Sequence, residues 1–164
     1  MPQVESVILK PGLCTEHDFA LFCKLVRQGG EVASLGLEVR VKAAKALVFL
    51  RVDNSAVGVA ALKAPSATYR DGVFRNAGVP NSAAQFELEL GWVFVLPEHR
   101  GRKYARVLSA AALSQAAGQP VFATTRLDNV PMQTTLEHLS LRRLGNSWRS
   151  DKGRKPFLLL YVTP

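Results

Sequence analysis

The hydrophobic and polar positions of this chain alternate between the pattern of β-strands and that of α-helices. Short apolar runs, most of them bounded by Gly, Pro, Asn, Asp or Ser, indicate strands. Asp53–Ser55 separates two of these runs closely enough to predict a hairpin. The predicted strands are Val4–Leu9, Ala46–Val52, Ala56–Leu62, Phe86–Leu96, Val121–Leu127, Leu141–Trp148 and Phe157–Val162.

Apolar positions at helical spacing predict helices between these strands. The first helix begins after Thr15, because Thr15 and Asp18 have the spacing of a capping box, and it ends at Gly29 and Gly30. A weaker helical pattern covers residues 34–44. The residues that predict the core-facing side of the first helix are Phe19, Phe22, Cys23 and Val26.

Two further helices are predicted in the second half of the chain. One extends from about Gly101 to Ala117. The other follows Asp128 or Asn129, both common N-cap residues, and has Pro131 in its first turn. The apolar face is assigned to Tyr104, Val107, Leu108 and Ala111 in the former helix and to Met132, Leu136 and Leu139 in the latter.

The polar segment Lys63–Ala84 is rich in Gly, Pro, Asn and Ser and is predicted to be a long loop. The elements then follow the order β-α-α-β-β-β-α-β-α-β-β. This order predicts an α/β (α+β) fold with a mixed central sheet of about seven strands, flanked on both faces by about four helices. We expect one domain over residues 1–164, since no segment has the composition of a linker.

Composition narrows the class of protein. The chain is 48% hydrophobic, which is enough for a substantial core. No apolar run approaches the ~20 residues of a membrane span, and residues 1–12 lack the apolar core of a signal peptide. Cys14 and Cys23 match no metal-binding spacing, so we expect reduced thiols and no metal. These features lead us to expect a cytoplasmic protein that does not bind a membrane.

The net charge of +8 attracts polyanions, whether nucleic acid, acidic membrane or a phosphate-rich cofactor. The positive residues form two clusters, and neither is interleaved with the aromatic side chains that stack on single-stranded bases. The second cluster is interpreted as a solvated face, and nucleic acid is not the favoured partner. The first cluster is Arg100, Arg102, Lys103 and Arg106, and the second is Arg142, Arg143, Arg149, Lys152, Arg154 and Lys155.

The first cluster lies where a strand gives way to a helix. The apolar strand ends at Pro97, a turn containing Gly101 follows, and the helix begins at once. Free N–H groups at a helix N-terminus bind anions, whereas the helix dipole disfavours cations there unless an anion joins them. The segment therefore predicts a pyrophosphate site. It lacks the Walker A and Rossmann patterns, which argues against P-loop NTPases and dinucleotide dehydrogenases.

This segment resembles the acetyl-CoA motif of the GNAT superfamily of N-acetyltransferases. In that motif an apolar strand runs into V-x-P-x-x, and [R/Q]-x-x-G-x-[G/A] then opens a helix. The matching residues are Val95–His99 and Arg100–Ala105. Downstream, the family's strand, its Asn and its apolar helix end match Ala123–Leu127, Asn129 and Leu136–Leu141. The resemblance covers nearly the whole chain, with the specific motifs confined to Leu88–Leu141.

The resemblance implies binding of acetyl-CoA as co-substrate and transfer of its acetyl group to a primary amine of a small molecule or protein. The backbone of Phe94 and Val95 would then pair with the pantetheine arm, and a backbone N–H near Val95 would stabilise the oxyanion. Lys103 stands where the family usually has Gly. The cofactor-binding residues implied by the resemblance are Phe94, Val95, Arg100, Gly101, Arg102, Lys103, Tyr104, Ala105 and Asn129.

Glu89 and Glu87 are the candidate catalytic residues. They alternate with apolar residues, which predicts that both carboxylates share one face of a strand. Glu89 stands eleven residues before Arg100, the spacing at which several family members carry a catalytic Glu. We therefore expect Glu89 to be the general base, with Glu87 as the alternative. At the position of the family's usual acid, a Tyr, this chain has Leu136.

Two alternatives to catalysis remain open at this stage. The chain could be a degenerate GNAT domain that binds CoA without turnover, an alternative that Leu136 at the position of the family's Tyr keeps open. It could also be a basic nucleic-acid-binding module, whose affinity would fall steeply with salt. The resemblance allows a homodimer and does not identify the amine.

Overall fold

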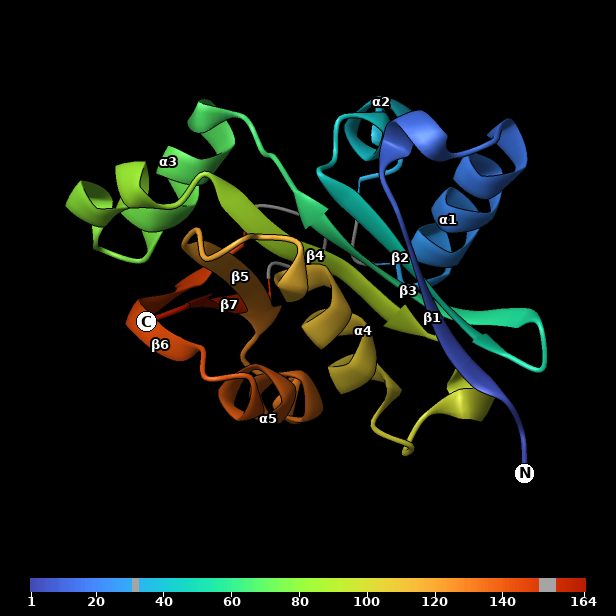
Figure 1. Ribbon diagram of the computed structural model, residues 1–164. Coiled ribbons are helices and arrows are strands. Elements are labelled where there is room, and N and C mark those ends of the chain that lie inside the picture. Colours follow the sequence, from blue (N-terminus) through green and yellow to red (C-terminus); the bar gives the residue numbers. More distant parts are fainter. Residues whose placement is uncertain (31–32, 151–155) are drawn as a thin grey trace. The chain divides into compact units, whose positions relative to one another are not determined.

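The computed structural model describes residues 1–30, 33–150 and 156–164 of the chain (Figure 1). Its seven strands are hydrogen bonded in the order β1-β2-β3-β4-β5-β7-β6. β4 and β5 are parallel, whereas β1 with β2, β2 with β3, β5 with β7 and β6 with β7 are antiparallel, so the predicted mixed sheet is confirmed. The strands are β1 (Val4–Leu9), β2 (Ala46–Val52), β3 (Ser55–Lys63), β4 (Leu88–Val95), β5 (Val121–Arg126), β6 (Arg142–Arg149) and β7 (Phe157–Val162).

The helices of the described residues include one more α-helix than the four predicted. Three short 3-10 helices accompany them. The α-helices are α1 (Glu16–Gln28), α2 (Leu37–Lys42), α3 (Ala67–Asn76), α4 (Tyr104–Ser114) and α5 (Val130–His138), and the 3-10 helices are η1 (Pro11–Leu13), η2 (Pro80–Gln85) and η3 (Pro97–His99).

The chain divides into two compact units, and β4 contributes residues to both. The first unit is Met1–Ala64 with Leu90–Ala117, and the second is Pro65–Glu89 with Gly118–Pro164. Each unit has its own helices and its own hydrophobic cluster.

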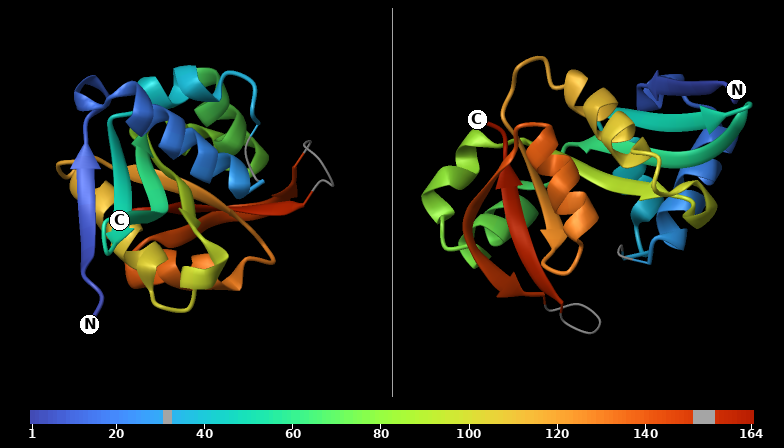
Figure 2. Two further views of the ribbon diagram at one scale, coloured as in Figure 1. Left: turned by 90° about the vertical axis from the view of Figure 1, so that its right-hand side faces the viewer. Right: turned by 90° about the horizontal axis from the view of Figure 1, so that it is seen from below.

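In the first unit, α1 and α2 cover one face of β1–β3, and α4 covers the other (Figures 1 and 2). Phe22 of α1 is fully buried and meets Phe49 of β2 edge-on, with ring centroids 5.6 Å apart. The predicted capping box is confirmed: Thr15 Oγ1 accepts the Asp18 N–H at 3.1 Å, and the Asp18 carboxylate accepts the Thr15 N–H at 2.8 Å. The four apolar residues expected on this face of α1 are all buried.

Close approach to β3 fixes the rotation of α4. A Cβ on Gly58 would lie 2.9 Å from Leu108 Cδ1 and 2.9 Å from the Phe94 carbonyl oxygen, so glycine allows the helix and the neighbouring strand to approach closely here. Leu108, Ser109 and Ala112 are buried, and Val107 is 41% exposed. The prediction that Val107 lies on the apolar face was therefore wrong, because the helix face that contains Leu108 and Ala112 packs against the sheet.

In the second unit, α3 and α5 lie on opposite faces of the β5, β7 and β6 strands (Figure 2). Phe74 of α3 is fully buried, and its ring centroid lies 5.3 Å from that of Phe86 and 5.3 Å from that of Phe122. On the α5 side, the Tyr161 hydroxyl donates to Glu137 Oε1 at 3.2 Å. Burial raises the pKa of this hydroxyl, with a smaller contribution from the Glu137 charge.

The prediction that Lys63–Ala84 is a loop was wrong, because this segment contains α3 and most of η2. Local sequence supports α3 weakly, since Gly72 lies inside it. Two features stabilise the helix nevertheless. Ser66 caps it by accepting the Tyr69 N–H at 3.2 Å, and Phe74 is buried in the core of the unit. Tertiary packing thus overrides the local preference.

The last strand in the order, β6, contains a bulge held against the end of α3. Its register with β7 shifts between Leu144 and Trp148, and Gly145 has φ +72°. The Asn146 N–H donates to the Ala77 carbonyl at 2.9 Å. A Cβ on Gly145 would overlap that carbonyl oxygen, at 2.2 Å, so no side chain fits at this position.

Candidate functional site

The turn between β4 and α4 has two residues in the left-handed conformation. Gly101 has φ +79° and Lys103 has φ +63°. Only glycine adopts this conformation freely, so Lys103 is strained by about 1–2 kcal/mol. The turn also delays the start of the helix, which begins at Tyr104 rather than at the predicted Gly101.

α4 begins without the side-chain cap that three other helices have. Thr15, Ser66 and Asn129 accept N–H bonds at the starts of α1, α3 and α5, whereas the N-cap residue of α4 is Lys103, which makes no such bond. A lysine offers no acceptor to the free N–H groups of a first turn. This helix N-terminus therefore combines uncapped donors with a positive side chain.

Arg100 is held against the end of β4. Its Nε donates to the Val95 carbonyl at 3.0 Å, and its guanidinium carbon lies 5.6 Å from the centroid of the Phe94 ring. This contact already occupies one acceptor position on the Val95 carbonyl. A guanidinium has further N–H groups, which can bind an anion while Nε maintains this contact.

The other cations of the turn have no carboxylate partner among the described residues. Arg102 Nη1 lies 3.4 Å from His99 Nδ1, and Lys103 is exposed. On the first turn of α4, Arg106 Nε is buried and makes no hydrogen bond within the described residues. The turn thus holds positive charge that the neighbouring described residues do not neutralise.

A second strained residue lies in the middle of β4. Trp92 has φ +53°, which is an outlier for a bulky side chain. Its ring is buried in the core of the first unit, where it meets Phe22 edge-on at 6.0 Å and lies 4.6 Å from Lys63 Nζ. Strain of this kind persists where packing on all sides enforces it, and it tends to mark functional segments. No pattern in the sequence indicates this conformation.

The structure separates the two candidate carboxylates. β4 begins at Leu88, so Glu87 lies outside the strand and is exposed. Glu89 is 2% exposed, and its Oε2 accepts the Tyr69 hydroxyl of α3 at 2.9 Å. The prediction that the two carboxylates share one face of a strand was therefore wrong. The 3-10 helix η2 ends at Gln85, and the chain joins the sheet only at Leu88.

The structure places two residues singled out from the sequence, Asn129 and Leu136, at the start of α5 and within it. Asn129 is the N-cap, and its Oδ1 accepts the Met132 N–H at 3.1 Å. Leu136 is fully buried, and it brings no proton donor to the position of the family's acid. Asn129 and Glu89 belong to the second unit, whereas Phe94, Val95 and the Arg100–Ala105 turn belong to the first.

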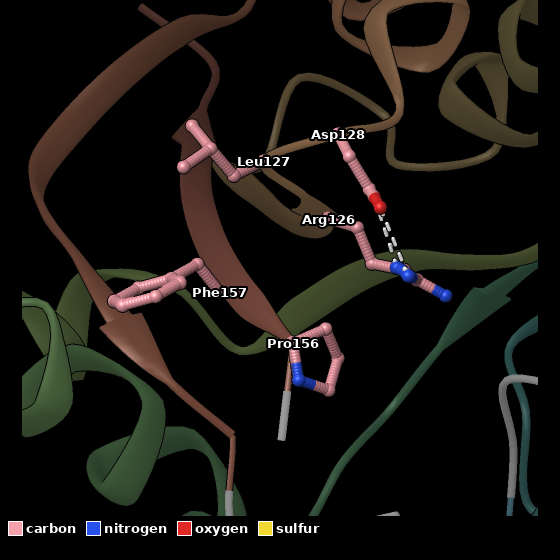
Figure 3. Close-up of a pocket in the computed structure, with 5 residues that line it drawn as sticks. All are labelled: Arg126, Leu127, Asp128, Pro156 and Phe157. Atoms are coloured by element: carbon pink, nitrogen blue, oxygen red, sulfur yellow. Dashed lines mark hydrogen bonds and ion pairs between the residues drawn. The ribbon is translucent and has the colours of Figure 1, made fainter. Parts of the chain in front are cut away.

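A shallow hollow of about 380 Å³ lies at the ends of β5 and β7 (Figure 3). Arg126 forms a two-pronged ion pair with Asp128, both distances being 3.0 Å, so its charge is largely balanced. The hollow therefore lacks the excess positive charge found at the start of α4. It is lined by Arg126, Leu127, Asp128, Pro156 and Phe157.

The second basic cluster gives no comparable site in the part of the chain described. Arg142, Arg143 and Arg149 are exposed, and the Arg149 guanidinium lies 5.0 Å from the centroid of the Phe157 ring. Lys152, Arg154 and Lys155 lie outside the described residues. Within those residues, no three His, Cys, Asp or Glu side chains gather as metal ligands do, and no helix has the length and apolarity needed to span a bilayer.

Comparison with known proteins identifies a matching protein family. Residues 17–139 match the model of the acetyltransferase (GNAT) family. The matched range contains Glu89, the Arg100–Ala105 turn, Asn129 and Leu136. No curated protein matches the sequence.

Solved structures of acyltransferases have the same fold. An acyl-CoA N-acyltransferase from Pseudomonas aeruginosa superposes with a TM-score of 0.69 at 11% identity, over 99% of this chain and 100% of that one. The putative acetyltransferase yncA from Salmonella typhimurium, determined with its cofactor acetyl-CoA, gives a TM-score of 0.66 at 15% identity, over 96% and 92%. FeeM, an N-acyl amino acid synthase from uncultured soil microbes, gives 0.74 at 12% identity, over 99% and 91%. At such identities the likeness concerns the fold alone.

Proposed function

Because the chain belongs to the acetyltransferase (GNAT) family, we propose that it transfers an acetyl group from acetyl-CoA to a primary amine of a small molecule or protein. The observation that supports this most strongly is the start of α4. There, an uncapped helix N-terminus, a lysine in the left-handed conformation and a group of cations without carboxylate partners among the described residues all favour a polyanionic ligand.

In this proposal, the turn binds the pyrophosphate of coenzyme A. The Tyr104 and Ala105 N–H groups at the start of α4 would donate to phosphate oxygens. The space at Gly101 is open to close approach, since a Cβ there would meet no atom of the described residues within 4 Å. Arg102 and Lys103 would neutralise charge, and Arg100 would do so while Nε holds the Val95 carbonyl. When bound, acetyl-CoA would supply an activated acetyl thioester.

Glu89 is the proposed general base. An amine attacks a thioester only in its neutral form, so a nearby carboxylate that accepts the proton promotes the reaction. Glu89 suits this role better than Glu87, because it is buried and held by a hydrogen bond, whereas Glu87 is an exposed residue outside β4. Leu136 supplies no acid, and a thiolate leaving group with a pKa of about 8–9 does not require one.

Binding of acetyl-CoA is tested by thermal unfolding. At a concentration of about 100 times Kd, a ligand that binds only the folded state stabilises it by about 2.7 kcal/mol. For a chain of this size, that raises Tm by about 5–10 °C. ATP at the same concentration is the control for general binding of phosphates. An unchanged Tm at millimolar acetyl-CoA would argue against the proposed function.

Catalysis is tested by release of free thiol from acetyl-CoA in the presence of a panel of primary amines and amino-terminal peptides. Turnover that depends on the amine and falls by about 10²–10⁴ in Glu89→Gln, the usual contribution of a positioned base, supports the proposal. Glu87→Gln is the matched control and should retain its rate. Binding without turnover of any amine would instead support the CoA-binding domain without activity.

A further inference from the structure

Helix α3 brings a tyrosine to the candidate base. Tyr69 is on the first turn of this helix, three residues after the cap Ser66, whose Oγ accepts the Tyr69 N–H at 3.2 Å. From there the Tyr69 hydroxyl reaches Glu89 Oε2 at 2.9 Å. Both residues belong to the second unit, so the contact lies within one compact part of the chain.

Burial makes this contact important for the carboxylate. Glu89 is 2% exposed, and a buried carboxylate without hydrogen-bond donors is strongly destabilised. Tyr69 is 40% exposed, so its hydroxyl reaches inward to Glu89 while part of the residue remains on the surface. The hydroxyl therefore donates to one oxygen of this buried carboxylate and restricts its orientation.

We infer that Tyr69 is a positioning residue for catalysis, which holds the Glu89 carboxylate in the orientation that accepts a proton from the acceptor amine. The inference rests on the proposed function. In the step concerned, the proton passes from the amine nitrogen to Glu89, and the nitrogen lone pair forms the new bond to the acetyl carbon as the thiolate departs. The Tyr69 O–H bond remains intact throughout.

The anchoring of α3 supports this role over that of an incidental surface contact. The helix is fixed at its start by the Ser66 cap and at its far end by Phe74, which is fully buried between Phe86 and Phe122. A hydroxyl carried by a helix fixed at both ends has little freedom to leave the carboxylate. Such fixed supporting groups keep a catalytic side chain in its productive geometry.

The test compares Tyr69→Phe with Tyr161→Phe. Both substitutions remove only a hydroxyl, and in each case that hydroxyl donates to a Glu within the second unit. We expect Tyr69→Phe to lower kcat about 10- to 100-fold, the value of a hydrogen bond to a charged group. It should leave the KM for acetyl-CoA unchanged, since Tyr69 is not part of the turn before α4. Tyr161→Phe should retain kcat even where its Tm falls.

A double-mutant cycle separates positioning from a structural effect. If Tyr69 acts through Glu89, then Tyr69→Phe combined with Glu89→Gln should be no slower than Glu89→Gln alone. Losses that multiply in the double variant would overturn the inference, as would wild-type kcat in Tyr69→Phe, while the proposed function would stand in either case. A wild-type protein that acetylates no amine would overturn the proposed function and the inference with it.

Discussion

The left-handed conformation of Lys103 can be separated from its charge by two substitutions. Lys103→Ala removes the ammonium group and retains a Cβ at φ +63°, whereas Lys103→Gly removes both. The two variants therefore have the same net charge, and the difference between them reports on the backbone alone.

The expected difference follows from the conformation. A residue with a Cβ in the left-handed region costs about 1–2 kcal/mol, and the greater freedom of glycine in the unfolded chain offsets about 0.5–1 kcal/mol of this. Lys103→Gly should thus be more stable than Lys103→Ala by about 1 kcal/mol, which corresponds to about 2–4 °C in Tm for a chain of this length. Thermal unfolding without ligand measures this difference directly.

Binding then reports on the charge. Lys103 is exposed, and an exposed ion pair contributes about 0.2–1 kcal/mol. Isothermal titration with acetyl-CoA should therefore show that Lys103→Gly binds within about fivefold of the wild type, because a difference of 1 kcal/mol changes Kd by no more than that. Abolished binding would instead identify Lys103 as a direct phosphate ligand. A lower Tm for the Gly variant than for the Ala variant would refute the argument from backbone strain.

Two further predictions concern the cations of the turn and the cysteines. Arg102→Ala should weaken acetyl-CoA binding by about 1–3 kcal/mol if its guanidinium binds a phosphate. Arg149→Ala, which removes an exposed arginine of the second basic cluster, should leave the affinity unchanged. Equal losses of affinity in titration calorimetry would mean that only the net charge matters. Burial raises the pKa of the Cys23 thiol above its ordinary value of 9.0. Because only the thiolate is nucleophilic, Cys23 should remain unmodified by a disulfide reagent at pH 8 in the folded protein. It should react once the protein is unfolded. Rapid modification of both cysteines without denaturant would contradict that expectation.

Local patterns identified most of the elements. The apolar runs predicted β1, β2 and β7 at their observed bounds, and the spacing of Thr15 and Asp18 predicted the cap of α1. These features depend on neighbours in sequence, so a single sequence contains the information for them. The basic turn before α4 was recognised for the same reason, since its residues are contiguous.

Features that depend on tertiary packing were missed. α3 is stabilised by the burial of Phe74 against residues distant in sequence. No local sequence pattern indicates these contacts. Tyr69 was missed with it, because the contact with Glu89 spans twenty residues and depends on where α3 lies. The positive φ of Trp92 likewise arises from packing around the ring and has no counterpart in composition or periodicity.

The bulge of β6 bears on the solubility of the protein. A terminal strand with regular N–H and C=O groups invites pairing with another chain and hence aggregation. In β6 the Asn146 N–H is turned to the Ala77 carbonyl, and exposed arginines flank the bulge at both ends of the strand. Because a Cβ on Gly145 would overlap the Ala77 carbonyl oxygen, we expect Gly145→Ala to weaken the contact between β6 and α3. We expect a larger aggregated fraction of this variant on expression, measured as the share of the protein that sediments after lysis.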